Sequence, residues 1–188
     1  NFFVNRIEDL ADAMREAFRI AQSGRKGPVL VDVTKDVTAA MIDYVPGEPL
    51  PLKEMPKAAE EELKQVAAVI NQAKCPVIYC GGGAASRQAE KELHALMEKA
   101  DIPAAHTMMA AGLVPHDDER SLGMIGMHGS VTANEALFHA DMVLALGTRF
   151  SDRVALNIEK FSPGAVKIQV DIDPCEINKN VPVDQYIV

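Results

Sequence analysis

The sequence contains no tryptophan, and only 5% of its 188 residues are aromatic. Basic residues are also scarce, since 19 Lys and Arg stand against 27 Asp and Glu, giving a net charge of −8. Proteins that bind a nucleic-acid backbone need clustered Lys and Arg, which argues against such a partner. No apolar run approaches the length of a membrane span, and nothing at the start resembles a signal peptide. The sequence therefore predicts a soluble protein with no nucleic-acid or membrane partner.

Cysteine and histidine are too few and too scattered for a disulfide framework or a metal site. Cys75, Cys80 and Cys175 form no CxxC pair, so we expect buried free thiols in a reducing cytoplasm. The five histidines do not fall at ligand spacing. We therefore predict a cytoplasmic protein without a metal in this chain.

What is present is an ordinary globular composition, with 48% hydrophobic and 24% charged residues. A length of 188 residues suits one domain, or one domain plus part of a neighbour. The chain opens on Asn1 rather than methionine, and its last residues, 186–188, resemble the start of a strand. We expect it to be a piece of a longer protein.

The first quarter of the chain predicts one helix, one strand and a linker. Apolar residues recur at helical spacing over residues 7–22, which predicts an amphipathic helix. The largely β-branched run VLVDV at 29–33 is typical of a buried strand. Four prolines within residues 44–56 favour extended conformations, so we expect an interdomain linker there.

After the linker, helical and strand patterns alternate. We expect helices at 58–73, 86–100 and 131–140, and strands at 76–80, 102–106, 142–147 and 166–173. Strands that alternate with helices at these intervals indicate an α/β fold. The predicted architecture is a Rossmann-like parallel sheet with helices on both faces.

In an open parallel sheet, ligands bind beyond the carboxyl ends of the strands. The first segment in such a place is YCGGGAAS, residues 79–86. Its glycines permit a tight turn and the close approach of a diphosphate to a helix N-terminus. The segment reads GxGxxS, with Ser86 in place of the last glycine of the dinucleotide motif. A plain strand–helix turn is an equal alternative.

The second such segment is LGTRFSDRV, residues 146–154. Arg149 and Arg153 are four residues apart and are suited to an anionic or planar ligand. The alternative is a surface cluster of ion pairs with Asp152.

The third segment, VDIDP at 170–174, ends a predicted strand with acidic residues. Such a carboxylate can accept a hydrogen bond from a ribose hydroxyl. Equally, Asp171 or Asp173 can cap the turn that follows.

The segment LGMIGMHGSVTANEA, residues 122–136, carries three glycines at a spacing of three and leads into a predicted helix. Such glycines indicate that the backbone comes close to another group. His128 is interpreted as a structural residue, because no nucleophile is placed beside it. The methionines of this region fill irregular apolar space or line a flat organic ring: Met108, Met109, Met124 and Met127.

Five segments together resemble the acetohydroxyacid synthase (acetolactate synthase) family of thiamine-diphosphate enzymes. They are SGRKGPVLVDVTKDV, CGGGA, GMHGSVTANEA, LGTRFSDRV and VDIDPCEINKNV, in the family's order and approximate spacing. The resemblance implies three parts of the chain. Residues 1–45 would be the tail of the pyrimidine-binding domain, 46–57 the linker, and 58–188 a central FAD-binding domain of about six strands.

The resemblance also implies the cofactor contacts. Arg25 would reach FAD from the neighbouring domain. The other FAD contacts that it implies are Gly81, Gly82, Gly83, Thr107, Met108, Met109, Gly126, Met127, His128, Gly147, Thr148, Arg149, Ser151, Arg153, Val154, Asp171 and Ile172. Asp171 and Ile172 would meet the adenosine half. The family pattern TLMGLG reads TMMAAG here, so the chain departs from it at two positions.

Family enzymes condense pyruvate with a second 2-ketoacid, using thiamine diphosphate and Mg²⁺ bound by other domains. They assemble at least as homodimers, often with a small regulatory subunit. The activating Glu and the Gly-Asp-Gly motif of the family are absent from this chain. We therefore expect the chain alone to contain no catalytic residue, to be inactive and to bind FAD weakly or not at all.

Two other readings stay open. The first is an FAD-independent structural or nucleotide-binding middle domain of another thiamine-diphosphate enzyme, and the second is a sirtuin-like NAD-binding domain. The pair GMHG and RFSDR favours the flavin type. A sirtuin needs a zinc module with two cysteine pairs, and the sequence has no CxxC.

Overall fold

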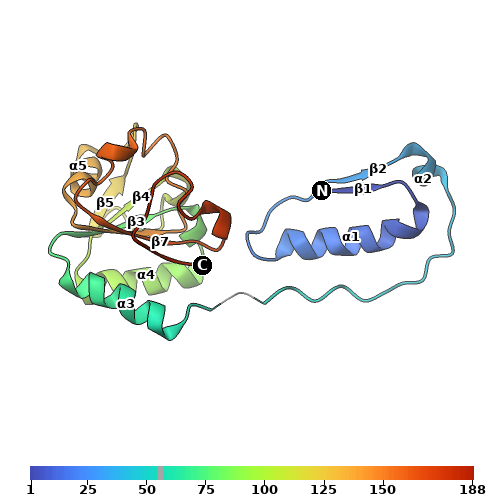
Figure 1. Cartoon of the computed structure of the whole chain (residues 1–188), viewed down its shortest axis with the longest axis horizontal. Helices are drawn as coiled ribbons and strands as arrows, with labels where there is room; N and C mark the ends of the chain where they lie inside the picture. The colour runs from blue at the N-terminus through green and yellow to red at the C-terminus, as the bar shows by residue number, and fades with distance from the viewer. Residues whose placement is uncertain (55–56) are drawn as a thin grey trace. The chain divides into compact units, whose positions relative to one another are not determined.

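The computed structural model describes residues 1–54 and 57–188. The chain divides into two compact units, Asn1–Lys57 and Ala58–Val188, which are drawn in Figure 1. Both units contain helices and parallel strands.

The first unit is a small α/β arrangement of four elements: β1 (Phe2–Val4), α1 (Ile7–Gln22), β2 (Val31–Val33) and α2 (Lys35–Ala39). β1 and β2 pair in parallel. The predicted helix over 7–22 is confirmed, and the predicted strand starts two residues later than expected. Residues 40–54 form no helix or strand, as the density of prolines predicts. Residues 55 and 56 of the predicted linker lie outside the described residues.

The second unit is built on a six-stranded parallel sheet, which confirms the predicted fold class. Its strands are β3 (Pro76–Cys80), β4 (Ala104–His106), β5 (Ser121–Met124), β6 (Met142–Leu146), β7 (Val166–Val170) and β8 (Gln185–Ile187). They lie in the order β5-β4-β3-β6-β7-β8, with every neighbouring pair parallel. The chain runs outward in one direction from β3 and in the other from β6. Such a reversal opens a crevice at the carboxyl ends of the two central strands.

Helices cover both faces of this sheet. Figure 1 shows α3 (Glu60–Gln72) and α4 (Arg87–Ala100) on one side and α5 (Val131–His139) on the other. Side chains alternate along each strand, so Ile78 and Cys80 of β3 belong to the core under α3 and α4. Val77 and Tyr79 belong to the core under α5. Because the central strands are buried on both faces, they are apolar throughout.

Several element boundaries differ from the predictions. The strand predicted at 102–106 starts at Ala104, after Pro103, whose ring nitrogen cannot donate to a neighbouring strand. The strand predicted at 166–173 ends at Val170. β5 was not predicted, because its sequence, SLGM, contains a glycine and shows little alternation.

The three cysteines are free thiols in different environments. Cys80 is buried in β3, and burial raises its pKa to about 12. Cys75 and Cys175 are exposed, so the prediction of buried thiols is correct for Cys80 alone. Cys75 lies just before β3 and Cys175 lies in a turn after β7, so neither belongs to the buried sheet.

Candidate functional site

The turns after β3 and β6 meet at the crevice between the two central strands. Their backbones are hydrogen-bonded to each other: the Gly81 N–H donates to the Leu146 carbonyl (2.8 Å), and the Gly83 N–H donates to the Gly147 carbonyl (3.0 Å). Gly147 is bonded in turn to Val170 at the end of β7 (2.8 Å). Three of the predicted glycines therefore lie at one point of the sheet edge.

The close packing of these turns explains why glycine is needed. A Cβ atom on Gly83 would lie 2.8 Å from the Gly147 Cα, and one on Gly147 would lie 2.6 Å from the Gly83 Cα. A Cβ on Gly81 would collide with the Gly147 carbonyl oxygen. Gly147 also has a positive φ of 57°, a conformation that glycine adopts without strain. Contact of these glycines with a cofactor stays a prediction, because backbone packing already accounts for them.

The glycine turn does not lead directly into a helix. Gly82–Ala84 form a single 3-10 turn, η1, and α4 begins only at Arg87. Ser86 is the N-cap of α4, and its hydroxyl oxygen accepts from the Ala89 N–H at 3.2 Å. The serine that replaces the last glycine of the dinucleotide motif thus has a capping role.

The segment after β4 places two methionines beside this turn. The Thr107 N–H donates to the Cys80 carbonyl (2.9 Å), and residues Met108–Ala110 form the 3-10 turn η2. Met108 and Met109 are 69% and 76% exposed, so they do not fill the core. A Cβ on Gly82 would lie 3.0 Å from the Met109 Cβ. Both methionine side chains are available to an apolar ligand at this edge.

The glycine segment after β5 packs against the segment after β6. The Met127 N–H donates to the Arg153 carbonyl (2.9 Å). Gly126 has a φ of 104°, and a Cβ there would lie 2.6 Å from the same carbonyl oxygen. The Asn134 amide fixes the turn, because it accepts from the Gly126 N–H (3.0 Å) and donates to the Gly126 carbonyl (3.1 Å).

The side chains of this turn are exposed at its tip. Met127 is 63% exposed, and His128 is exposed as well. Ser130 caps α5, with its hydroxyl oxygen accepting from the Ala133 N–H at 3.0 Å. The close approach at Gly126 is therefore to the Arg153 segment, and the one at Gly129 is to the backbone of Met124 and Ile125.

The loop Gly147–Val154 is held by a buried aromatic ring. Phe150 is 2% exposed, and its ring centroid lies 5.7 Å from that of Tyr79 and 5.6 Å from that of Phe161. Its φ of 48° is left-handed, a strained conformation for a residue with a bulky side chain. Packing of the ring holds this conformation, and the two neighbouring residues, Arg149 and Ser151, lie nearer the surface.

The two predicted arginines are exposed. Arg153 forms an ion pair with Asp152, with Nε 3.8 Å from the carboxylate oxygen. Exposed pairs of this kind contribute about 0–1 kcal/mol. The alternative of a surface ion pair thus applies to Arg153, and the carbonyl of Arg149 accepts from the Asn180 amide at 2.8 Å.

The acidic residues after β7 have capping roles. Asp171 is 9% exposed, and its Oδ1 accepts from the Asp173 N–H at 3.0 Å. Asp173 in turn accepts from the Cys175 N–H at 3.0 Å and caps the 3-10 turn η4 (Pro174–Glu176). A hydrogen bond from a ribose hydroxyl to the Asp171 carboxylate stays a prediction.

An apolar cavity of about 380 Å³ lies between α4 and the ends of β6 and β7. It is lined by Gly83, Ala84, Ala89, Glu92, Leu93, Leu96, Leu146, Gly147, Val170, Asp171 and Ile172. Four predicted contacts share this cavity: the two glycines, the aspartate and the isoleucine.

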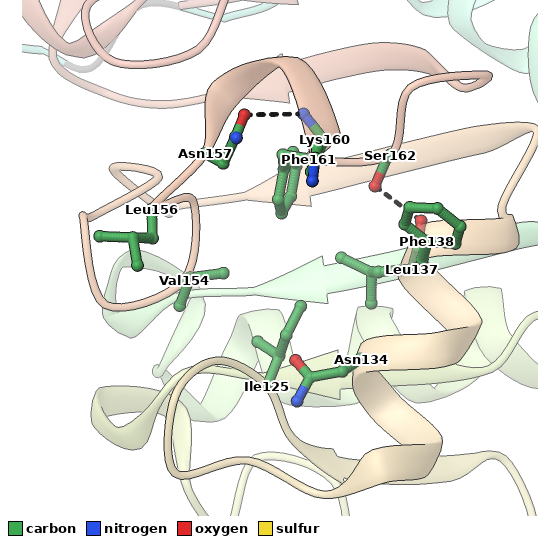
Figure 2. Close-up of a pocket in the computed structure, with 10 residues that line it drawn as sticks. All are labelled: Ile125, Asn134, Leu137, Phe138, Val154, Leu156, Asn157, Lys160, Phe161 and Ser162. Atoms are coloured by element: carbon green, nitrogen blue, oxygen red, sulfur yellow. Dashed lines mark hydrogen bonds between the residues drawn. The ribbon is translucent and has the colours of Figure 1, made fainter.

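A second cavity, of about 200 Å³, lies on the α5 side of the sheet. Figure 2 shows its lining, in which Val154 is the single predicted site residue. The Ser162 hydroxyl at its rim donates to the Leu137 carbonyl (2.7 Å). The two cavities therefore share no lining residue.

All predicted contacts of the second unit follow the carboxyl ends of β3 to β7, so the fold brings them to one edge of the sheet. Arg25 belongs to the first unit and is exposed there. Sequence reasoning missed Phe150, Asn134 and the buried Gln169. A glutamine within the apolar strand VKIQV is the one signal that could have been noticed.

Two negative findings apply to the described residues. Within 1–54 and 57–188, no helix is long and apolar enough to cross a membrane. In the same ranges, no group of three or more His, Cys, Asp or Glu side chains is arranged to hold a metal ion.

Comparison with known proteins gives a family match. Residues 63–188 match the family described as "Thiamine pyrophosphate enzyme, central domain". The chain is 42% identical to the acetolactate synthase large subunit of Corynebacterium glutamicum, covering 100% of this chain and 30% of that protein. It is 44% identical to the isozyme 1 large subunit of Escherichia coli (95% and 32%) and 44% identical to the chloroplastic acetolactate synthase of Arabidopsis thaliana (96% and 27%). The chain thus spans about a third of the length of these relatives.

Proposed function

We propose that this chain, which belongs to the thiamine pyrophosphate enzyme family and matches its central domain, supplies the FAD-binding domain of an acetolactate synthase. The whole enzyme would condense pyruvate with a second 2-ketoacid in branched-chain amino-acid synthesis. The observation that carries the proposal is the convergence of GGG, GMHG, RFSDR and DIDP on one sheet edge, in a chain 42–44% identical to acetolactate synthase large subunits.

The residues at this edge fit the adenosine half of FAD. The cavity beside Asp171 and Ile172 is lined mainly by apolar side chains and glycines, a setting that suits an adenine ring. Asp171 lies at its rim as a hydrogen-bond acceptor for a ribose hydroxyl. In the proposal, Gly83 and Gly147 border the same cavity and leave room for the nucleotide.

Other residues of the same edge fit the diphosphate and the ring system. Arg149 and Arg153 are exposed cations on one loop, suited to a diphosphate. Exposed Met108, Met109 and Met127 offer flat apolar contact to an isoalloxazine ring. In the family, FAD takes no net redox part, so these residues would bind and orient it while His128 lies beside it without a catalytic role.

The other parts of the enzyme belong to the proposal as well. Thiamine diphosphate and Mg²⁺ would be bound by domains outside this chain, and the first unit would complete the pyrimidine-binding domain, with Arg25 reaching FAD. The enzyme would be at least a homodimer, with a small regulatory subunit as a further partner. A net charge of −8 speaks against a nucleic-acid partner. We assign it to the cytoplasm; the plant relatives are chloroplastic by name.

An activity measurement tests the proposal. The full-length protein that carries this chain should form acetolactate from pyruvate when supplied with thiamine diphosphate, Mg²⁺ and FAD. The 188-residue chain alone should form none, because it lacks the activating Glu and the Gly-Asp-Gly motif. Acetolactate formation by the chain alone, or its absence in the full-length protein, would contradict the proposal.

A second candidate is a middle domain that holds no FAD, in another thiamine-diphosphate enzyme. One observation favours it. A Cβ atom on Gly81, Gly83 or Gly147 would collide with the backbone of the facing turn, so glycine would be needed at these positions even without a cofactor. Equilibrium titration of the full-length protein with FAD, NAD and ADP separates the two. Saturable binding of FAD alone supports the first candidate, and binding of ADP or of no nucleotide supports the second.

A further inference from the structure

Gln169 is a polar residue in the interior of the sheet. It lies in β7 between Ile168 and Val170, and it is 0% exposed. A buried amide without partners destabilises a protein, so such residues are retained where they form hydrogen bonds. The question is which groups this amide holds.

Its nitrogen joins two segments that leave the sheet separately. The Gln169 Nε2 donates to the Thr148 carbonyl and to the Glu176 carbonyl, at 3.2 Å each. Thr148 belongs to the loop after β6, and Glu176 belongs to the turn after β7. Both acceptors are carbonyl oxygens, so the amide nitrogen, with its two hydrogens, must point toward them. No carboxylate could replace it there.

The sheet register explains how the amide reaches this place. Tyr79 of β3 pairs with Ala145 of β6, and Ala145 pairs with Gln169 of β7. The three side chains form a row on the α5 side of the sheet, and the methyl group of Ala145 leaves room between the two longer ones. Tyr79, Ala145 and Gln169 are each 0% exposed, so the row is shielded from water. Hydrogen bonds in such surroundings are costly to lose.

The two joined segments carry the two sides of the proposed FAD site. The loop after β6 bears Arg149 and Arg153, and the segment after β7 bears Asp171 and Ile172. Other contacts also act here: Phe150 anchors the loop in the core, Asp173 caps its own turn, and the Asn180 amide, further along the segment after β7, donates to the Arg149 carbonyl. The Gln169 amide, in β7, is hydrogen-bonded to both segments at once.

We propose that Gln169 is a positioning residue that fixes the spacing between the arginine-bearing loop and the Asp171 segment. It does not touch the cofactor and acts through the two carbonyls. The inference rests on the proposed function, because the two sides matter for binding only if FAD lies between them.

The test compares two variants of the full-length protein by flavin fluorescence quenching. Gln169→Glu keeps the shape but sets an acceptor against two carbonyl oxygens, and we expect the Kd for FAD to rise at least about tenfold. Gln169→Met keeps the volume without donors and should weaken binding less. Lowering the pH should partly restore FAD affinity in Gln169→Glu, since a protonated carboxyl can donate once.

A second readout separates positioning from general loss of stability. Hydrogen–deuterium exchange of the two segments, 147–154 and 171–176, should rise together in both variants while β3 and β6 stay protected. Ser162→Ala is the matched control, because Ser162 is 1% exposed and its hydroxyl donates to the carbonyl of Leu137, which belongs to neither segment. It should leave FAD affinity and exchange of the two segments unchanged.

The outcomes distinguish this inference from the proposed function. If the wild-type protein binds no FAD, the proposed function is wrong, and the inference is wrong with it. If the wild-type protein binds FAD and Gln169→Glu binds it equally well, the positioning role alone is wrong. An equal loss of FAD affinity in Ser162→Ala would also overturn the positioning role.

Discussion

The two units are built from the same kinds of elements but bury their apolar residues very differently. In Asn1–Lys57, Val4, Ala17 and Val37 are the buried apolar residues among those described. In Ala58–Val188, apolar cores lie on both faces of the sheet. The helix over 7–22 in the first unit was predicted with its observed bounds, so a clear helix signal alone does not make a core.

The physical reason is the number of layers. Two short strands and one long helix can cover only one side of each element. Phe18 on α1 and Leu30 before β2 are accordingly 61% and 66% exposed. An apolar groove of about 580 Å³ runs along α1 within this unit. The second unit should therefore be stable by itself, and the first should depend on further contacts.

The largest expected effect comes from separating the units. Residues 58–188 alone should keep an α/β circular dichroism spectrum and unfold cooperatively on heating. Residues 1–57 alone should lack stable structure, because a unit of this size is marginally stable even with a complete core and this one buries few apolar side chains. Cooperative melting of the 1–57 peptide would remove the contrast between the units.

A matched pair of isoleucines compares the two cores directly. Ile78 is 0% exposed and Ile20 is 42% exposed. We expect Ile78→Ala to lower the free energy of unfolding by about 4 kcal/mol, because it leaves a cavity. Ile20→Ala should cost less than about 1 kcal/mol. Urea unfolding of both variants measures the difference, and similar losses would contradict the account.

Two glycines, Gly81 in the second unit and Gly27 in the first, compare how tightly the backbone of each unit is packed. Gly81→Ala should destabilise the protein by about 3 kcal/mol, because the new Cβ collides with the Gly147 backbone. Gly27 has no atom within 4 Å of such a Cβ and no positive φ. Gly27→Ala should therefore be neutral or stabilise by up to about 0.5 kcal/mol. Thermal unfolding of the two variants checks the ranking.

The smallest expected effect is on pH dependence. The pKa of Asp141 lies below its ordinary value of 3.8, because its carboxylate accepts from the backbone N–H groups of Lys74 (2.6 Å) and Cys75 (2.9 Å). A carboxyl whose pKa is lowered by folding stabilises the protein above its unfolded pKa, and this contribution is lost as pH falls through the folded pKa.

Asp141→Asn should thus lower stability at neutral pH and flatten its fall below about pH 4. The control is Glu16→Gln in the first unit, where a side-chain hydrogen bond from Arg19 lowers the pKa of Glu16. Glu16 lies in the unit without a complete core. We therefore expect Glu16→Gln to leave the loss of stability at low pH, measured on the cooperative unfolding transition, unchanged. Unfolding midpoints across pH 2–7 measure both variants. An unaltered loss of stability at low pH in Asp141→Asn would contradict the stabilising role of its two hydrogen bonds to Lys74 and Cys75.

The fold was largely predictable from the sequence because its central strands, β3 and β6, are apolar on both faces. PVIYC was predicted with its observed bounds, and so was the helix over 7–22. β5 was not predictable, because its strand hydrogen bonds depend on β4 and its sequence contains Gly123 at a φ of 83°. The short β1 and α2 were missed for a similar reason, since three to five residues give too little periodicity.

The segments of the candidate site were predictable from the sequence, but the contacts that hold these segments in place were not. Motif order placed GGG, GMHG, RFSDR and DIDP, but it did not predict that Gly81 and Gly83 pack against Gly147. Pairwise contacts such as Gly83 with Gly147 join residues more than sixty positions apart, and no single-sequence pattern contains them. The roles of Phe150 and Gln169 likewise depend on which strands lie side by side.

The central claim is that the carboxyl edge of the second unit is the flavin site. It is tested most directly by hydrogen–deuterium exchange of the full-length protein with and without FAD. We predict that FAD slows exchange in 81–85, 107–110, 126–129, 147–154 and 171–176 together, and leaves the α5 side around Ser162 unchanged. Saturating FAD that slows exchange elsewhere, or nowhere, would contradict the claim.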